Sequence, residues 1–465
     1  MKESSSAGKL GLRTRLNRGA FGAKTAVVMR RERAAAAYLA QAERLSPAEL
    51  EGRARQRTMA LARHAYEQTD FYRRLYSEAG LTRADLERPE NLEALPLLRK
   101  EAVRAHGEEM RARELPAERF LRSVTGGSTG SPLVVYNDRL APHAAMWWRV
   151  YRWWGVHPGD DTAFVYRQKH AGIDAVKEYL TWWPTRHLLL DARDMDDAAV
   201  DRFLRDCRRV RPRLMVGYVE GVVALAKRLQ DRGMTVAAPH AISVTSSVLH
   251  PGQREFMERV MGAPVYDTYR SAEVPWMAAE CRERSGLHVQ ADIRHLEIVD
   301  DTGLPVPAGE TGAVAVTDLT NRAFPLIRYA IGDRSRALAG TCGCGMTLPR
   351  IGAIEGRVAD SLLTPTGTEI VGGFSALFNK WPTAVQQFQI HQYADHAVEL
   401  RYVPGVDIAL AEHAVAEVCA TLGRLLHGEV EIRAVRRQRI EHDGGKARLV
   451  RSEIAAEESG NSATS

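Results

Sequence analysis

The sequence lacks any run of about 18 apolar residues, so it predicts no membrane-spanning helix. It has only five cysteines in 465 residues, too few for a disulfide framework. The start of the chain is basic but lacks the apolar core of a signal peptide, which indicates a cytoplasmic protein.

Lysine is also scarce, since nine of the 64 basic residues are lysine and the rest are arginine. The net charge of +6 is modest, but nine basic and only two acidic residues lie between Lys2 and Arg33. Phe21 is the only aromatic residue among them, so no stacking platform for nucleic acid is predicted. We therefore expect residues 1–40 to form a solvated and partly disordered basic arm with an Ala-rich helical stretch at its end.

The remaining length is too great for one simple core, so two further domains are expected, at 41–356 and 357–465. In the first, Ser46 and Pro47 are typical of the start of a helix that Gly80 would end. Short β-like runs then alternate with helical segments, which predicts α/β layers with parallel strands. The strand candidates lie at 120–125, 132–136, 162–166, 187–191, 214–218, 241–246 and 263–269, and the helices at 197–210, 220–233 and 251–262.

The later part of the chain has a different pattern. Two β runs flank a Gly/Pro-rich turn at 295–319, as in an antiparallel hairpin or a small barrel. Residues 357–465 predict a compact α+β unit, with a hairpin at Thr366-Gly367, strands within 384–404 and 430–440, and a helix at 407–428. The expected fold is therefore α/β: a large N-terminal domain of layered sheets and helices with a small barrel-like part, and a small mobile α+β C-terminal domain.

The stretch "SVTGGSTGSPLVVYND", Ser123 to Asp138, fits two quite different sites. Its G-x-S-x-G spacing matches the nucleophile elbow of a serine hydrolase, which requires a helix after the turn. Pro132 and the β-branched residues after it predict a second strand instead. A loop between two strands, rich in glycine and hydroxyl groups, suits the binding of anionic oxygens through backbone N–H groups.

Five motifs in order resemble those of the adenylate-forming (acyl-CoA synthetase) superfamily, and within it the phenylacetate–CoA ligase/CapK-like branch. They are "TGGSTGSP" at 125–132, "YRSAE" at 269–273, "FPLIRYAIGD" at 324–333, "IEGRVAD" at 354–360 and "GGKAR" at 444–448. The resemblance covers roughly residues 45 to 455. The resemblance implies activation of a small-molecule carboxylic acid by ATP and Mg²⁺ as an acyl-adenylate, followed by transfer to coenzyme A.

The resemblance leaves the acceptor open. The alternative acceptors to coenzyme A are an amine and a carrier-protein thiol, and transfer of AMP itself is an alternative reaction. A non-catalytic nucleotide-binding protein is an alternative of a different class. The motif residues Glu273, Asp333, Arg357 and Lys446 are all present, which argues against a non-catalytic protein. Nucleic acid is not an expected partner, and the sequence leaves a homodimer open.

The same resemblance implies a role for each motif residue. Lys446, Glu273 and Thr125 would be catalytic, Glu273 as the Mg²⁺ carboxylate, and Asp360 would be the hinge. Tyr136, Tyr218 and Arg270 would contact the acid. The nucleotide-binding residues would be Ser123, Thr125, Gly126, Gly127, Ser128, Thr129, Gly130, Ser246, Ser247, Asp267, Tyr269, Arg270, Asp333 and Arg357.

Arg270 and Lys446 stand out from the rest of the pattern. Arg270 replaces the small glycine of the family's Tyr-Gly-x-Ser-Glu motif, where it would narrow the acyl pocket or pair with an extra group on the substrate. Phenylacetate itself is therefore not the expected substrate. Lys446 is one of only two lysines after residue 357, and a compact ammonium group suits a single developing anion.

Three of the five cysteines form a candidate metal site with a histidine. Cys281, His288, Cys342 and Cys344 lie in segments rich in glycine and arginine. Three thiolates and one imidazole would complete a tetrahedral structural zinc, and buried free thiols are the alternative. Cysteines at these places in CapK-like relatives favour Zn²⁺, which would have no role in the chemistry.

Overall fold

The computed structural model describes the chain in several stretches. These are residues 11–124, 133–166, 173–192, 195–249, 251–354, 361–371, 384–438, 440 and 449–454, with 374, 377, 378, 380 and 381 between them. The α-helices are α1 (Leu12–Val28), α2 (Arg30–Ala42), α3 (Pro47–Gln68), α4 (Asp70–Glu78), α5 (Lys100–His106), α6 (His143–Trp153), α7 (Ile173–Trp182), α8 (Asp197–Val210), α9 (Val219–Asp231), α10 (Pro251–Met261) and α11 (Ile408–Leu425). No helix in these stretches is long and apolar enough to cross a membrane.

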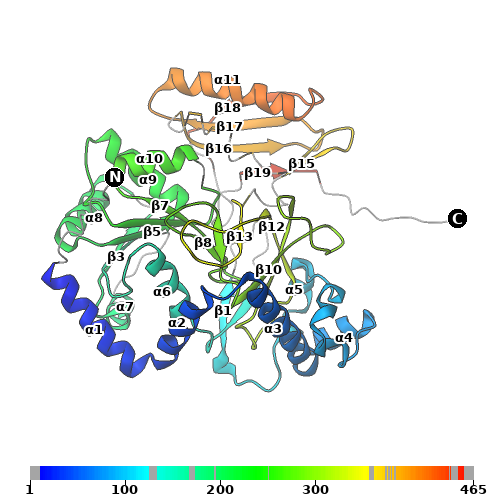
Figure 1. Cartoon of the computed structure of the whole chain (residues 1–465). Coiled ribbons are helices and arrows are strands. Elements are labelled where there is room, and N and C mark those ends of the chain that lie inside the picture. Colours follow the sequence, from blue (N-terminus) through cyan, green and yellow to red (C-terminus); the bar gives the residue numbers. More distant parts are fainter. Residues whose placement is uncertain are drawn as a thin grey trace.

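The prediction of a solvated arm is wrong for residues 11–40, which form α1 and most of α2 and pack on the large domain (Figure 1). Arg18 makes two hydrogen bonds to the buried carboxylate of Asp160, at 2.7 and 2.8 Å. The ring of Phe21 lies edge-on to Trp148, with centroids 5.4 Å apart. The charge pattern of the arm could not reveal these partners, because they lie more than 120 residues away along the chain.

The single helix predicted after Ser46 is two helices. Its start is confirmed, because Ser46 and Glu49 form a capping box in which the Glu49 carboxylate accepts from the Ser46 N–H at 2.9 Å. The break comes at Thr69, which has an extended backbone and caps α4 by accepting from the Tyr72 N–H at 3.2 Å. A threonine hydroxyl competes with helix hydrogen bonds and so favours such a boundary.

One sheet of 11 strands runs through the large domain in the order β10-β11-β12-β13-β9-β8-β7-β6-β5-β3-β4. Its parallel part confirms the predicted alternation of strands and helices. The strands of this part are β3 (Thr162–Tyr166), β4 (His187–Asp191), β5 (Leu214–Tyr218), β6 (Ala241–Thr245) and β7 (Val265–Tyr269).

Alternate side chains of these strands pack on opposite faces of the sheet. Met215 and Ile242 belong to the core under α8, α9 and α10, whereas Leu214 and Ala241 pack in the core that includes α6. Helices on both faces bury β6 entirely and most residues of β5 and β7, which explains why apolar residues predominate on both faces of these strands.

The part expected to be barrel-like is the antiparallel end of the same sheet. The predicted hairpin is confirmed as β10 paired with β11, and β12 adds to it. The strands of this end are β8 (Ala278–Glu280), β9 (Leu287–Val289), β10 (Arg294–Val299), β11 (Thr311–Asp318), β12 (Tyr329–Leu338) and β13 (Arg350–Ile351). A separate hairpin pairs β1 (Phe120–Val124) with β2 (Val134–Asp138).

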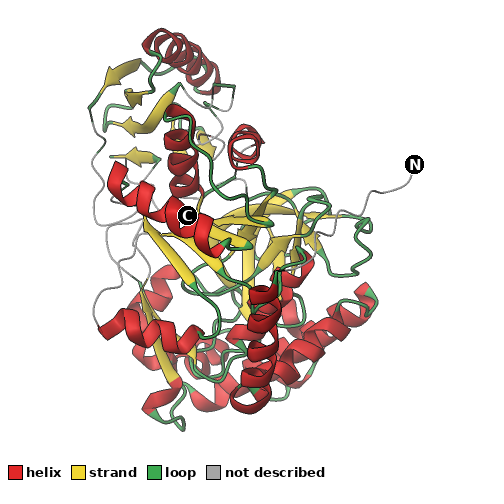
Figure 2. Cartoon of the chain, turned by 90° about the vertical axis from the view of Figure 1, so that its left-hand side faces the viewer, coloured by secondary structure: helices red, strands yellow, loops and turns green. Residues whose placement is uncertain are grey.

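The C-terminal residues form an α+β unit beside the large domain, as Figures 1 and 2 show from two sides. A four-stranded sheet in the order β18-β17-β16-β19 packs its apolar side chains against α11. The predicted hairpin at Thr366-Gly367 is confirmed as β14 and β15. The strands of this unit are β14 (Ser361–Leu363), β15 (Glu369–Val371), β16 (Val385–Gln392), β17 (Val398–Pro404), β18 (Ile432–Arg436) and β19 (Val450–Ser452).

Candidate active site

The carboxyl ends of the parallel strands meet at one edge of the sheet, which is where open α/β sheets bind ligands. Tyr218 ends β5, Tyr269 ends β7, and Ser246 and Ser247 follow β6. Ser246 has a φ of 83°, a conformation that costs free energy for a residue with a side chain. These four predicted residues therefore share the edge of the sheet that ligands use.

Tyr269 and Asp333 are joined by a direct hydrogen bond. The Tyr269 hydroxyl donates to Oδ2 of Asp333 at 2.7 Å. The two residues are 64 positions apart, one ending β7 and the other lying within β12. The sheet thus brings together two of the predicted nucleotide-binding residues, and the hydrogen bond fixes the orientation of the Asp333 carboxylate.

Glu273, the predicted Mg²⁺ carboxylate, is 6% exposed and lies near a lysine. Nζ of Lys100 is 3.9 Å from Oε1 of Glu273, and it also lies close to the backbone at Gly332. Lys100 reaches this place because Leu98 pairs with Tyr329 next to it. The Leu98 N–H donates to the Arg328 carbonyl at 3.1 Å, and the Ala330 N–H donates to the Leu98 carbonyl at 2.9 Å.

Sequence reasoning missed Lys100, because 173 residues separate it from Glu273. The scarcity of lysine was the one signal that could have drawn attention to it. The side chain of Tyr329 is fully buried beside this cluster, so its pKa responds to the nearby charges. Burial raises the pKa of Tyr329, and the negative charges of Glu273 and Asp333 raise it further. The cluster thus carries two carboxylates in a partly desolvated place, a setting that attracts cations.

Arg270 lies among aromatic side chains. Its Nη2 donates to the hydroxyl of Tyr166, and its guanidinium lies over the ring of Trp276, 5.0 Å from the centroid. The Tyr166 ring is in turn 4.8 Å from that of Tyr218. The structure therefore brings Arg270 and Tyr218, two of the three predicted acid-binding residues, into one group through Tyr166.

Tyr136, the third residue predicted to contact the acid, lies in a different group. Its hydroxyl donates to Glu108 at 3.1 Å, and its ring packs between Phe120 and Phe324. Among the described residues, its ring and hydroxyl contacts all lie outside the aromatic group around Arg270. Tyr136 belongs to β2, whose hairpin with β1 positions it there.

Asp267 lies beside an ion pair instead of one of the other predicted site residues. Arg254 and Glu280 form two hydrogen bonds, at 2.8 and 2.9 Å, and Glu280 also accepts from the Asp267 N–H at 2.8 Å. Burial, and then the negative charge of Glu280, raise the pKa of Asp267 to about 7. This carboxyl therefore titrates near neutral pH.

The strand, loop and strand predicted around the glycine-rich motif are confirmed at both ends of the loop. Val124 of β1 pairs antiparallel with Val134 of β2, so no helix follows as a nucleophile elbow would need. Ser123 is partly buried in this hairpin and pairs with Val135. The loop residues Thr125, Gly126, Gly127, Ser128, Thr129 and Gly130, together with Arg357, Asp360 and Lys446, lie outside the described residues.

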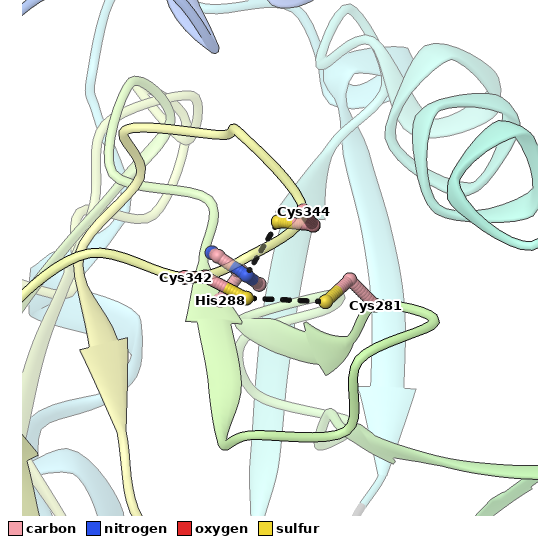
Figure 3. Close-up of side chains that lie close together, drawn as sticks. All are labelled: Cys281, His288, Cys342 and Cys344. Carbon is pink, nitrogen blue, oxygen red and sulfur yellow. Dashed lines mark hydrogen bonds between the residues drawn. The ribbon is translucent and has the colours of Figure 1, made fainter. Parts of the chain in front are cut away.

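The predicted metal ligands lie together (Figure 3). The donor atoms of Cys281, His288, Cys342 and Cys344 all lie within 4.8 Å of one another. Sγ of Cys281 is 3.6 Å from Sγ of Cys342, and Sγ of Cys344 is 3.4 Å from Nε2 of His288. The pairing of β13 with both β9 and β12 brings the loop that carries Cys342 and Cys344 over His288.

The surroundings of His288 suit a metal ligand. Its Nδ1 lies 3.3 Å from the carbonyl oxygen of Leu348, which orients the ring and leaves Nε2 toward the cysteines. Burial lowers the pKa of His288, which favours the neutral imidazole that binds metals. Three thiols and one such imidazole fit a closed tetrahedral zinc site.

Comparison with solved structures shows which fold this chain has. The chain aligns with a 2-hydroxyisobutyryl-CoA ligase in its postadenylation state with a TM-score of 0.71 and 21% identity, over 88% of this chain and 91% of that one. An anthranilate CoA ligase aligns with a TM-score of 0.50 and 16% identity, over 72% and 67%. The fold is that of acyl-CoA ligases of the adenylate-forming superfamily.

Sequence comparison narrows the relationship. The phenylacetate-coenzyme A ligase of Thermus thermophilus is 28% identical over 374 residues, 76% of this chain and 80% of that protein. That of Escherichia coli is 28% identical over 334 residues, 69% and 74%. No family model matches the chain. The chain is similar in sequence to phenylacetate-coenzyme A ligases over most of its length, which confirms the resemblance read from its motifs.

Proposed function

We propose that the protein is an AMP-forming ligase, which activates a carboxylic acid with ATP as an acyl-adenylate and then transfers the acyl group to coenzyme A. The observation that carries the proposal is the cluster of Glu273, Lys100, Tyr269 and Asp333 beside the carboxyl ends of the parallel strands. The homologues at 26–28% identity support the same reaction, because all four are phenylacetate-coenzyme A ligases.

Asp333 would bind the ribose of ATP. Its carboxylate has two oxygens, and one of them already accepts from Tyr269. A carboxylate accepts hydrogen bonds at both oxygens, which is the chemistry that a pair of ribose hydroxyls requires. The Tyr269 ring would lie against the adenine, and its hydroxyl would hold the carboxylate in place before the nucleotide arrives.

Glu273 would hold Mg²⁺, since a hard cation takes oxygen ligands and this carboxylate is nearly buried. When bound, the ion would neutralise charge on the phosphates. Lys100 adds an ammonium group on the same side, where the attacking carboxylate and the α-phosphate would concentrate negative charge. Lys100 and the bound ion would share the task of charge neutralisation around Glu273.

The remaining roles rest on the motifs. The loop Thr125–Gly130 would bind the phosphates through backbone N–H groups, and Ser123 would support it from β1. Ser246, Ser247, Asp267 and Arg357 would complete the nucleotide site, Asp360 would act as the hinge, and Lys446 would reach the α-phosphate. The cytoplasm remains the proposed location.

We also propose that Cys281, His288, Cys342 and Cys344 hold one structural zinc ion. All four protein ligands would occupy the tetrahedral positions, so no open position remains for a substrate. The ion would tie the loop before β13 to β9 and stabilise the antiparallel end of the sheet.

Pyrophosphate release across a panel of carboxylic acids, with and without coenzyme A, tests the reaction. We expect release that depends on one class of acid and on Mg²⁺, and a thioester product when coenzyme A is present. Pyrophosphate release with an acid but no thioester product would show that coenzyme A is not the acceptor. An amine, a carrier-protein thiol or transfer of AMP would then replace it in the proposal. No release with any acid would end it.

A further inference from the structure

The guanidinium of Arg270 has only neutral partners in the part of the chain that the structure describes. It donates to the Tyr166 hydroxyl and lies over the rings of Tyr166 and Trp276, 5.7 and 5.0 Å from their centroids. No carboxylate among the described residues pairs with it. A cation held among aromatic rings gains some cation–π attraction, but its full charge remains without an anion.

Other arginines in the described interior are treated differently. Arg149, Arg294 and Arg328 are each 2% exposed or less, and each has a carboxylate within 3.0 Å. This is the usual rule for charges inside proteins, because an unpaired buried charge is costly. Arg270 is half-buried, and no carboxylate among the described residues plays the part that Glu43, Asp318 and Glu297 play for these three arginines.

The place of Arg270 indicates what would pair with it. It directly follows Tyr269, which binds Asp333, and it lies three residues before Glu273. Tyr166 and Tyr218, which complete the aromatic group, end β3 and β5 at the same edge of the sheet. The cation is therefore held in the ligand-binding region, next to the cluster proposed to activate the acid.

Arg270 is also held in a defined position. Tyr166 accepts one of its N–H groups, Trp276 covers one part of the guanidinium, and the Tyr218 ring supports Tyr166 from the side. Its remaining N–H groups make no hydrogen bond among the described residues. A planar guanidinium with free N–H groups matches the two oxygens of a carboxylate.

We propose that the acid is a dicarboxylate, activated at one carboxyl while the other pairs with Arg270. The carbon skeleton would lie against the aromatic group formed by Tyr166, Tyr218 and Trp276. A second carboxylate fits better than a hydroxyl group, because only an anion neutralises the charge of Arg270. This inference rests on the proposed ligase function and names the substrate class for it.

The test compares acids that differ only in the second carboxyl. Aliphatic dicarboxylates of four to eight carbons and the benzenedicarboxylates are each matched with the monocarboxylate of the same skeleton. The measurement is kcat/KM for pyrophosphate release. We expect at least one dicarboxylate to exceed its matched monocarboxylate by about 10- to 100-fold, the range for a charge-assisted bidentate pair.

Variants at the site then assign that preference to Arg270. Arg270→Ala should remove the preference by lowering the dicarboxylate value about 10- to 100-fold, while the monocarboxylate value changes only a few-fold. Arg270→Lys keeps the positive charge but loses the paired N–H groups of the guanidinium, so it should retain part of the preference for the dicarboxylate. Arg205→Ala, at an exposed arginine of α8, is the matched control and should leave both values unchanged. Tyr166→Phe should weaken the preference in the same direction, and it serves if Arg270→Ala does not fold.

Three outcomes would overturn the inference. In the first, monocarboxylates are activated as well as or better than their matched dicarboxylates. In the second, Arg270→Ala lowers both values equally, so that Arg270 binds the reacting carboxylate or supports the fold. These two leave the ligase function standing. In the third, no acid supports pyrophosphate release, and the proposed function fails together with the inference.

Discussion

Lys227 on α9 donates from Nζ to the carbonyl oxygen of Val385 on β16, at 2.9 Å. This hydrogen bond joins the large domain to the C-terminal unit in the arrangement of Figure 1. Lys227 is half-buried at this contact, and this burial lowers its pKa. A rotation of the C-terminal unit would break the bond.

Lys227→Met should therefore weaken this arrangement of the two parts. A hydrogen bond from a charged group contributes about 1.5–3 kcal/mol, so cleavage between the two parts should accelerate about 10-fold or more. Limited proteolysis followed by mass spectrometry of the fragments would measure it. Lys24→Met, which loses a bond to backbone carbonyls within the large domain, is the control. Equal cleavage rates in Lys227→Met and wild type would show that the contact does not hold the parts together.

Asp360→Pro should separate the two half-reactions. One active site must exclude water for adenylation and then admit a second nucleophile, so two closed arrangements are expected. A hinge residue absorbs a change in φ that proline cannot follow. We expect thioester formation to slow far more than acyl-adenylate formation in a single-turnover quench experiment. If both steps slow by the same factor, Asp360 is not the hinge.

Lys446→Ala should lower the rate of adenylation by about 10²–10³, the usual cost of losing one preorganised charge donor. Lys100→Ala should act on the same step, because Lys100 lies 3.9 Å from Glu273. Isotope exchange between pyrophosphate and ATP measures this step without coenzyme A. Lys380→Ala, at an exposed lysine of the C-terminal unit, is the matched control. Wild-type exchange in Lys446→Ala would remove its assigned role.

Protein purified without added metal should contain about one equivalent of zinc. Cys344→Ala should lower the zinc content and reduce Tm by about 2–4 °C, the shift that corresponds to about 1–2 kcal/mol in a domain of this size. Elemental analysis and a thermal melt measure both. Cys419→Ala, at a partly buried free thiol on α11, should leave the zinc content unchanged. Zinc-free wild-type protein with an unchanged Tm would contradict the site.

The raised pKa of Asp267 predicts a loss of stability as the pH rises. Between the ordinary value of 3.8 and about 7, the folded chain keeps a proton that the unfolded chain has released. Stability therefore falls with pH across that range, by at most about 1.4 kcal/mol per pH unit from this group. The contribution is fully present below pH 3.8 and lost above about pH 7.

Asp267→Asn removes this titration. The Tm of the variant minus the Tm of wild type should therefore increase from pH 5 to pH 8. Thermal melts at several pH values measure the difference. Asp301→Asn, at an exposed turn residue, should track wild type throughout. A constant difference between Asp267→Asn and wild type would show that Asp267 does not titrate in this range.

The sequence by itself determined the features that depend on neighbouring residues. Short runs rich in apolar and aromatic residues, alternating with helical segments, were enough to predict β3 to β7, because strands covered by helices on both faces need apolar residues on both sides. The helix start at Ser46 depended on a capping box closed within four residues. The choice of a strand after the glycine-rich loop followed from Pro132 and the β-branched residues beside it.

Only the tertiary structure decided which distant residues meet. Lys100 lies beside Glu273 because Leu98 pairs with Tyr329, and no local pattern encodes a pairing over more than 200 residues. Arg18 likewise pairs with Asp160, a residue 142 positions away along the chain. Contacts of this kind hold α1 and α2 against the large domain, where the sequence predicted a solvated arm. Side-chain chemistry specifies what a residue needs, whereas the packing of the whole chain decides which partner meets that need.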